Sequence, residues 1–315
     1  MARLEDKRFA ILHAGPGDAG ERLDIFLSLR FRRSRTVIRR RLAGDVVDSA
    51  GRPIKWSHRL RQGEIVRVVT IERPEPDVEV GYRLLYQDDW IVVVDKGSGA
   101  PVHPTRSYRT RTVLTRLRED LADDGINPAH RLDRETSGVL IFGRRARAIR
   151  ELMRAFRERR VEKRYLAVVR GSVGFDRLRV AEPLGRDGDY PIDCRMKVDR
   201  RNGSPAVTDL EVLDRRVDRS LVAARPRSGR QHQIRVHLAC LGHPILGDKL
   251  YQQDGQPYLA MVHGKLDADA LDRLGHTRQA LHAQAIEFDH PENGQRMHLS
   301  APLPADLQEL LGQRA

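Results

Sequence analysis

The chain has 315 residues, of which 57 are Lys or Arg and 44 are Asp or Glu, so its formal net charge is +13. Hydrophobic residues make up 40% of the sequence, which excludes a wholly disordered chain, and the length suits two domains or one large domain with an appendage. Two cysteines exclude a disulfide-rich scaffold and a four-cysteine zinc site.

Arginine dominates the basic residues, since only seven of the 57 are lysines. The planar guanidinium binds phosphate bidentately and stacks on bases. A genome that favours arginine codons would explain the preference for arginine over lysine, but it would not explain the excess of positive charge. We therefore expect a nucleic-acid partner.

The N-terminal sequence MARLEDKRFAILHAG contains no apolar run long enough for a signal peptide. The longest apolar runs, such as residues 91–94, are far shorter than a membrane span. We therefore expect a cytoplasmic protein without membrane association, and we assign residues 1–18 to a short extension.

A small basic module is predicted over residues 19–72. The sequence RLDIFLSLRF indicates a helix, Ser34 can cap a second helix over RTVIRRRLAG, and short strands follow in DVVDSAGRPIKW and RQGEIVRVVTI. Seven arginines and no acidic residue lie within residues 30–41. Such a run is usually a solvated surface, but uncompensated charges repel each other, which favours a phosphate partner. The predicted contacts are Arg35, Arg39 and Arg40.

Residues 73–82 are rich in proline and acidic side chains and are predicted to form a linker. A larger domain over residues 83–315 follows. Its first notable block, IVVVDKGSGAPVHPT at residues 91–105, indicates a buried strand that runs into a structured loop. This loop lacks the GxxxxGK[ST] spacing of a phosphate-binding P-loop.

The second block is AHRLDRETSGVLIFGRR, residues 129–145. Asp133 lies in a polar turn before an apolar strand, with His130, Arg131 and Arg134 beside it. A carboxylate among cations keeps a low pKa and stays ionised, which suits a nucleophile or a base. A structural ion pair in the turn is the alternative that spacing alone leaves open.

A helix follows over ARAIRELMRAFRERR, where the apolar stripe of Ile149, Leu152, Met153 and Phe156 is predicted to face the core. The next segment, VEKRYLAVVRG, indicates a strand. Tyr165 lies on an inward or cleft-facing side of this strand, where a buried core tyrosine is the usual occupant.

The third block is SGRQHQIRVHLACLGHPILGDKLY, residues 228–251. Ser228 and Gln231 fit a capping box, followed by a helix that presents Arg235 away from its apolar stripe. The histidines and Cys240 in this block are metal-ligand types, but their spacing does not bring them together on a helix. We therefore predict no metal site.

The basic module resembles the S-four RNA-binding domain through RLDIFL, Ser34-Arg35, Gly44-Asp45-Val46 and Gly63-Glu64-Ile65-Val66. The larger domain resembles the RluA-type pseudouridine synthase family. The segments that carry this resemblance occur in the family's order: DKGSGAPVHP, HRLDRETSGVLIF, VEKRYLAVVRG, GRQHQIRVHLACLGHPILGDKLY and ALHAQAIEFDHP.

This resemblance implies an α+β fold, with a mixed and largely antiparallel sheet, flanking helices and a cleft. The reaction that it implies needs no cofactor. Nothing in the sequence demands more than a monomer. Asp133 would be the catalytic carboxylate, Tyr165 would stack on the base, and Arg235 would pair with Asp133. A uracil inside an RNA helix cannot reach such a pocket, so the target nucleotide would be flipped out. Arg131 would fill the vacated space, and His130 would contact the RNA or buttress the loop.

Three functions follow from these observations. The motifs together with the basic module favour a synthase that modifies large-subunit ribosomal RNA. A synthase that modifies transfer RNA fits the same motifs. The third possibility is a non-catalytic RNA-binding or ribosome-assembly factor on this fold. A degenerate enzyme, however, would be expected to have lost Asp133, Tyr165 or Arg235, and all three are present.

Overall fold

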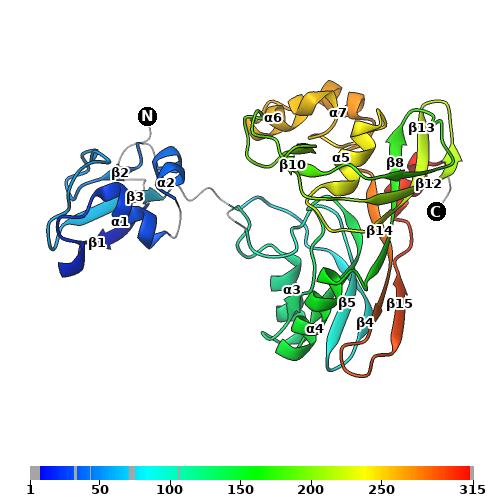
Figure 1. Ribbon diagram of the computed structural model, residues 1–315, viewed down its shortest axis with the longest axis horizontal. Coiled ribbons are helices and arrows are strands. Elements are labelled where there is room, and N and C mark those ends of the chain that lie inside the picture. Colours follow the sequence, from blue (N-terminus) through cyan, green and yellow to red (C-terminus); the bar gives the residue numbers. More distant parts are fainter. Residues whose placement is uncertain (1–7, 32–33, 43, 71–74, 106, 313–315) are drawn as a thin grey trace. The chain divides into compact units, whose positions relative to one another are not determined.

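The computed structural model describes residues 8–31, 34–42, 44–70, 75–105 and 107–312. The chain divides into two compact units, an N-terminal unit of residues 1–74 and a C-terminal unit of residues 75–315 (Figure 1). In the described ranges, no helix has the length and apolar character needed to cross a membrane.

The N-terminal unit packs two helices on a three-stranded antiparallel sheet with the strand order β1-β3-β2. Its helices are α1 (Leu23–Arg30) and α2 (Arg35–Arg41), and its strands are β1 (Arg8–His13), β2 (Val46–Val47) and β3 (Ile65–Thr70). Leu23, Phe26 and Leu27 of α1 are buried in its core. Ser34 caps α2, because its side chain accepts a hydrogen bond from the backbone of Val37.

Strand β1 lies within residues 1–18, which the sequence analysis assigned to an extension outside the module. The structure places this strand in the sheet, fully paired with β3. Ala10 and Leu12 pack against the core of the unit, whereas Ile11 between them is 56% exposed. This alternation is typical of a half-buried strand. The strand was not predicted because the alternation extends over only six residues.

The predicted linker at residues 73–82 also differs from the structure. Residues 73 and 74 lie outside the described residues, and residues 75–81 belong to the C-terminal unit. The Glu75 carboxylate accepts hydrogen bonds from the backbone of Thr110 and Arg111, which fixes the start of this segment on the larger unit.

The C-terminal unit is built on a ten-stranded sheet. Its main path runs β4-β5-β7-β14-β8-β13-β12-β9, with β15 on β14 and β6 on β7. The strands are β4 (Tyr82–Gln87), β5 (Ile91–Lys96), β6 (Asn127–Pro128), β7 (Ser137–Gly143), β8 (Glu162–Arg170), β9 (Arg177–Val180), β12 (Thr208–Arg215), β13 (Arg219–Pro226), β14 (Leu281–Asp289) and β15 (Arg296–Ser300). A separate antiparallel pair is formed by β10 (Leu184–Arg186) and β11 (Met196–Val198).

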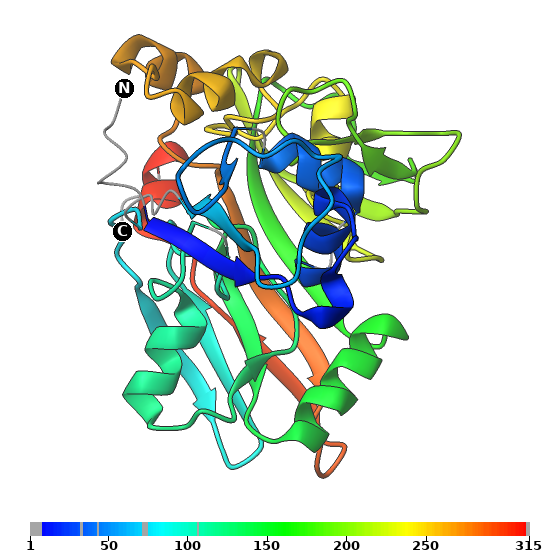
Figure 2. The same cartoon turned by 90° about the vertical axis from the view of Figure 1, so that its left-hand side faces the viewer.

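Only the pairing of β7 with β14 is parallel among the described strand pairs. The predicted mixed, largely antiparallel α+β fold is therefore confirmed. Helices α3 and α4 flank the part of the sheet that contains β4 and β5, and α5, α6 and α7 lie beside its other end (Figures 1 and 2). The helices are α3 (Val113–Leu121), α4 (Ala146–Arg157), α5 (Gln233–Cys240), α6 (Gln256–Val262), α7 (Ala268–Leu274) and α8 (Ala305–Leu310).

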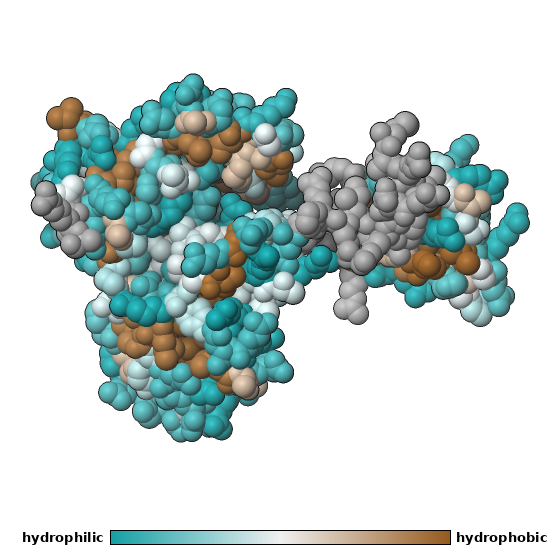
Figure 3. Space-filling model, turned by 180° about the vertical axis from the view of Figure 1, so that it is seen from behind, coloured by the Kyte–Doolittle hydropathy of each residue, from teal (hydrophilic) through white to brown (hydrophobic). Residues whose placement is uncertain are grey.

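Strand β7 is buried along its whole length, which explains its unbroken apolar sequence Val139–Phe142. The face of the C-terminal unit drawn in Figure 3 is largely hydrophilic. Helix α4 departs from the predicted core stripe: Ala148, Leu152 and Ala155 are its buried residues, and Met153 is 44% exposed.

Gly138 allows β7 and β14 to approach at their parallel contact. Its φ is +111°, and a Cβ atom there would lie 2.2 Å from the carbonyl oxygen of Ala283. We expect Gly138→Ala to destabilise the C-terminal unit by about 3 kcal/mol, because a strained backbone adds to a clash with backbone atoms. Guanidinium denaturation of the full chain measures this change.

Gly174→Ala is the matched control, since a Cβ atom at that glycine would meet no atom within 4 Å. If the two variants unfold at the same denaturant concentration, the close approach at Gly138 is not a constraint on the fold.

Candidate active site

Asp133 lies in the turn that leads from β6 into β7, and the backbone N–H of Thr136 closes this turn on the Asp133 carbonyl at 3.1 Å. Its Oδ2 accepts a hydrogen bond from Arg235 Nη1 at 2.8 Å. The two side chains are 21% and 9% exposed. The structure thus brings together two residues that are 102 positions apart in the sequence and were both predicted for the site.

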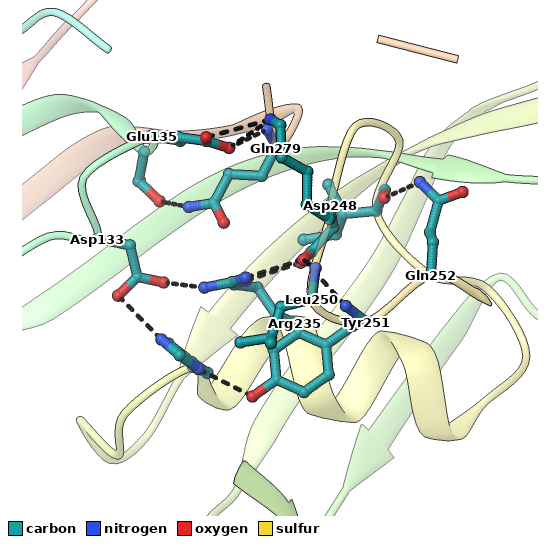
Figure 4. Close-up of polar contacts among 12 residues, drawn as sticks. Asp133, Glu135, Arg235, Asp248, Leu250, Tyr251, Gln252 and Gln279 are labelled. Carbon is teal, nitrogen blue, oxygen red and sulfur yellow. Dashed lines mark hydrogen bonds and ion pairs between the residues drawn. The ribbon is translucent and has the colours of Figure 1, made fainter. Parts of the chain in front are cut away.

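A second carboxylate, that of Asp248, binds Arg235 on the side opposite to Asp133 (Figure 4). Asp248 Oδ2 accepts from Arg235 Nε at 2.7 Å, and Asp248 Oδ1 accepts from Nη2 at 2.8 Å. The backbone N–H groups of Leu250 and Tyr251 also donate to Asp248, which is fully buried. Asp248 lies in the LGDKLY segment of the third block, where no sequence pattern predicted a role for it.

Asp133 is ionised at neutral pH. Burial alone would raise the pKa of Asp133, but three effects outweigh burial and keep the pKa below the usual value of 3.8. These are the charge of His232, which is present only in the acid range where Asp133 itself titrates, the charge of Arg235, and the Arg235 hydrogen bond. The predicted low pKa is confirmed, and the cation that forms the hydrogen bond is Arg235. Arg134, the sequence neighbour, instead donates to the Tyr108 hydroxyl.

His232 precedes α5 in the left-handed backbone conformation, with φ 57°. Its Nε2 lies 3.9 Å from Asp133 Oδ1, and its Nδ1 lies 2.8 Å from the Tyr251 hydroxyl. Burial lowers the pKa of His232 to about 4, so the ring is neutral at pH 7. In the sequence, His232 stood out only as one of several residues of a metal-ligand type.

The predicted capping box at Ser228 and Gln231 is wrong. Helix α5 begins at Gln233, whose side-chain oxygen accepts hydrogen bonds from the Ser228 hydroxyl and the Arg230 backbone. The partner of Ser228 is therefore two residues later than predicted, because His232 in the left-handed conformation delays the first turn of the helix.

Tyr165 on β8 lines a cavity of about 630 Å³ together with Asp133 and Arg235. We call it the Tyr165 cavity. Burial and the Asp133 charge raise the pKa of Tyr165, so its hydroxyl stays protonated at neutral pH. Basic residues also line this cavity, namely Arg157, Arg159, Lys163, Arg227 and Arg230.

Arg131 is exposed and also lines the Tyr165 cavity. His130 bonds within the protein: its Nε2 accepts from the Ile141 backbone at 3.2 Å, and its ring centroid lies 4.7 Å from that of Phe156. Of the two roles predicted for His130, the geometry favours buttressing of the loop over RNA contact. Burial lowers the pKa of His130 to about 3, so this ring is also neutral.

Lys96 stabilises the turn that carries Asp133. No sequence pattern predicted this role. Lys96 is fully buried, and its Nζ donates to the carbonyls of Gly97 and Arg134 at 2.7 and 3.0 Å. Burial lowers the pKa of Lys96 to about 7. Its position at the end of the buried strand β5, in the DKG sequence, was the available signal.

The basic run of the N-terminal unit does have a counter-charge. Asp24 on α1 is fully buried, and Arg22, Arg35 and Arg39 all bond to its carboxylate, Arg35 at 2.8 Å. Burial opposes ionisation, but these three guanidinium groups hold the pKa of Asp24 well below its usual range. Three cations on one anion leave an excess of two positive charges. The Arg40 side chain lies outside the described residues.

Residues 90–240 match the RNA pseudouridylate synthase family. The chain is 35% identical over 308 residues to an uncharacterized RNA pseudouridine synthase of Mycobacterium bovis, covering 94% of each chain. It is 32% identical over 308 residues to ribosomal large subunit pseudouridine synthase C of Vibrio parahaemolyticus, covering 93% of this chain and 92% of the relative. The structure of human RNA pseudouridylate synthase domain containing 1 superposes with a TM-score of 0.59 and 29% identity, covering 75% and 89% of the two chains.

Removal of the Arg235 cation should raise the pKa of Asp133, because burial then acts against ionisation without this opposing charge. The double variant Arg235→Gln/Asp248→Asn tests this without leaving Asp248 as an unpaired buried charge. The ¹³Cγ shift of Asp133, followed against pH, reports the midpoint directly.

Asp248→Asn alone is the control, since it keeps Arg235 beside Asp133 and should keep the midpoint low. The assignment of Arg235 as the controlling cation fails if the double variant titrates where the control does.

Proposed function

Because the chain belongs to the RNA pseudouridylate synthase family, and is thus an isomerase that acts on RNA, we propose that it converts specific uridines of large-subunit ribosomal RNA to pseudouridine with Asp133 as the catalytic carboxylate. The observation that carries this proposal is the ionised Asp133, oriented by Arg235 on the wall of the Tyr165 cavity.

The reaction breaks the bond between uracil N1 and ribose C1′, turns the base, and forms a bond from C5 to C1′; C5 loses a proton and N1 gains one, so the product is an isomer of uridine. No electrons are gained or lost overall. The sugar becomes electron-poor when the first bond breaks, and a fixed carboxylate stabilises this state. Attack of Asp133 on C1′ and removal of a ribose proton by Asp133 both require the ionised form that Arg235 favours.

Tyr165 and Arg131 have complementary roles in this proposal. The Tyr165 ring stacks on the uracil as a neutral phenol, because its hydroxyl keeps its proton. The target nucleotide must leave the RNA stack to reach the cavity. The exposed Arg131 then fills the vacated space, where its guanidinium stacks and donates hydrogen bonds to the unpaired partner.

The N-terminal unit contributes affinity through phosphate contacts in an S-four-like manner. Arg35 and Arg39 keep 50% and 42% of their side chains exposed while they bond to Asp24, so their outer edges are free to meet phosphate. A large structured RNA offers phosphates beyond the target loop. This second contact region, and the relatives named as large-subunit synthases, favour ribosomal RNA over transfer RNA as the substrate.

Asp133→Asn should lower turnover by about 10³-fold or more, because the amide is isosteric but carries no charge. RNA affinity should change little. Pseudouridines are mapped by carbodiimide labelling and primer extension in RNA from cells that lack the protein, and from such cells complemented with the wild type or the variant. We expect discrete ribosomal sites to disappear and to return only with the wild type.

Each other outcome overturns a separate part of the proposal. Sites restored by Asp133→Asn would exclude Asp133 as the catalytic group. Loss of transfer-RNA sites alone would replace the substrate. RNA binding without any change of sites would favour a non-catalytic factor.

Arg35→Gln/Arg39→Gln should weaken RNA binding by about tenfold and reduce the slope of log affinity against log salt by about one per arginine. Turnover at saturating RNA should remain unchanged. Arg52→Gln is the control, because Arg52 lies in the same unit but outside α2, on Asp48. Equal loss of affinity in both variants would indicate only a general charge effect.

A further inference from the structure

We infer that His232 recognises the 2′-hydroxyl of the target ribose: its Nε2–H donates a hydrogen bond to that hydroxyl, which in turn donates to Asp133 Oδ1. This inference rests on the proposed function and adds the group that distinguishes RNA from DNA at the reacting nucleotide.

The two oxygens of Asp133 have different surroundings. Oδ2 accepts the hydrogen bond from Arg235 at 2.8 Å. Oδ1 lies 3.9 Å from His232 Nε2, which is beyond hydrogen-bond distance, and no group of the described chain donates to it directly. Oδ1 is therefore the oxygen left available for a substrate.

The Tyr251 hydroxyl determines which nitrogen of His232 carries the proton. This hydroxyl accepts from the Met196 backbone N–H at 3.0 Å and lies 2.8 Å from His232 Nδ1. A backbone N–H can only donate, and His232 Nδ1 is the one acceptor among the described hydrogen-bond partners of this buried hydroxyl, so the hydroxyl directs its own proton to Nδ1. A neutral imidazole with an accepting Nδ1 carries its proton on Nε2. The donor of His232 thus faces Asp133.

The imidazole is held in this orientation. Its side chain is 11% exposed, and its ring meets the Tyr251 ring edge-on, with centroids 5.6 Å apart and planes at 81°. The backbone at residue 232 is left-handed, which is unusual for a residue with a side chain larger than that of glycine. The position costs backbone strain and keeps a donor beside the catalytic carboxylate.

One hydroxyl group fits the gap between the two residues. An oxygen that lies at the ordinary hydrogen-bond length of about 2.8 Å from both Nε2 and Oδ1 would form an Nε2–O–Oδ1 angle of roughly 90°. The group must accept from Nε2–H and donate to Oδ1, which a hydroxyl does and a uracil carbonyl does not. The ribose 2′-hydroxyl is one bond from the carbon next to the reacting C1′.

The gap between His232 and Asp133 lies at the position where the ribose of the target nucleotide is expected. His232 and Asp133 line the Tyr165 cavity and also a second cavity of about 310 Å³, which contains Tyr108 and Tyr258. A nucleotide whose base enters the Tyr165 cavity therefore places its ribose against this shared wall. Recognition of the 2′-hydroxyl there selects ribonucleotides.

Two substitutions at residue 232 separate the donor from the rest of the side chain. His232→Asn tolerates the left-handed backbone and can still meet Tyr251, but its amide ends at the position of Nδ1. His232→Gln can carry an amide N–H to the position of Nε2. The probes are two synthetic RNA hairpins that carry the mapped uridine, one with ribose and one with 2′-deoxyribose at the target.

We expect the wild type to bind the ribose hairpin about tenfold more tightly than the deoxyribose hairpin. His232→Asn should lose most of this ratio by weakening only the ribose complex, and His232→Gln should retain part of it. An unchanged ratio in His232→Asn would overturn the inference, and would indicate that water fills the gap in the complex.

A second measurement needs no RNA. The ¹⁵N shifts of the His232 ring in the full-length protein should show the proton on Nε2, and Tyr251→Phe should redistribute it between the two nitrogens. A proton on Nδ1 in the wild type overturns the inference. Absence of pseudouridine formation by the wild type would refute the proposed function instead, so the two failures are distinct.

Discussion

The Arg235 guanidinium lies between two carboxylates, the fully buried Asp248 and the 21% exposed Asp133, and the geometry of the site depends on how it divides its donors between them. Asp248 takes two of these hydrogen bonds and fixes the plane of the guanidinium. The remaining edge is then aimed at one oxygen of Asp133. A lone buried carboxylate would take up a proton, and a freely rotating arginine would satisfy both of its oxygens. The fixed bridge avoids both results.

The sheet brings the parts of this bridge together. Asp133 precedes β7, Tyr165 lies on β8, and β14 separates these two strands by a single sheet position. The parallel contact of β7 with β14 at Gly138 sets how closely the turn that carries Asp133 approaches β8. The start of α5 then supplies two more residues: His232 lies at the N-cap position just before the helix, and Arg235 lies in its first turn. Both side chains can reach the same carboxylate.

The sequence predicted the parts of this arrangement that local pattern or family resemblance encodes. The fold class, the low pKa of Asp133 and the Ser34 cap follow from such signals. Asp248, Tyr251 and Asp24 gained their roles only from contacts between segments, which no periodicity reveals. The capping box failed because a left-handed residue shifted the helix start, and β1 was missed because six alternating residues are a weak signal.

The shared carboxylate of Asp24 bears on how the N-terminal unit would meet RNA. Arginine side chains lose rotamer entropy when a phosphate immobilises them. Arg22, Arg35 and Arg39 are already ordered by Asp24, so most of that loss occurs when the chain folds and not when RNA arrives. Asp24 competes with phosphate for these guanidinium groups, but it also orders them before RNA binds. The binding of phosphate to this cationic surface is therefore expected to carry a smaller entropic penalty than binding to flexible arginines.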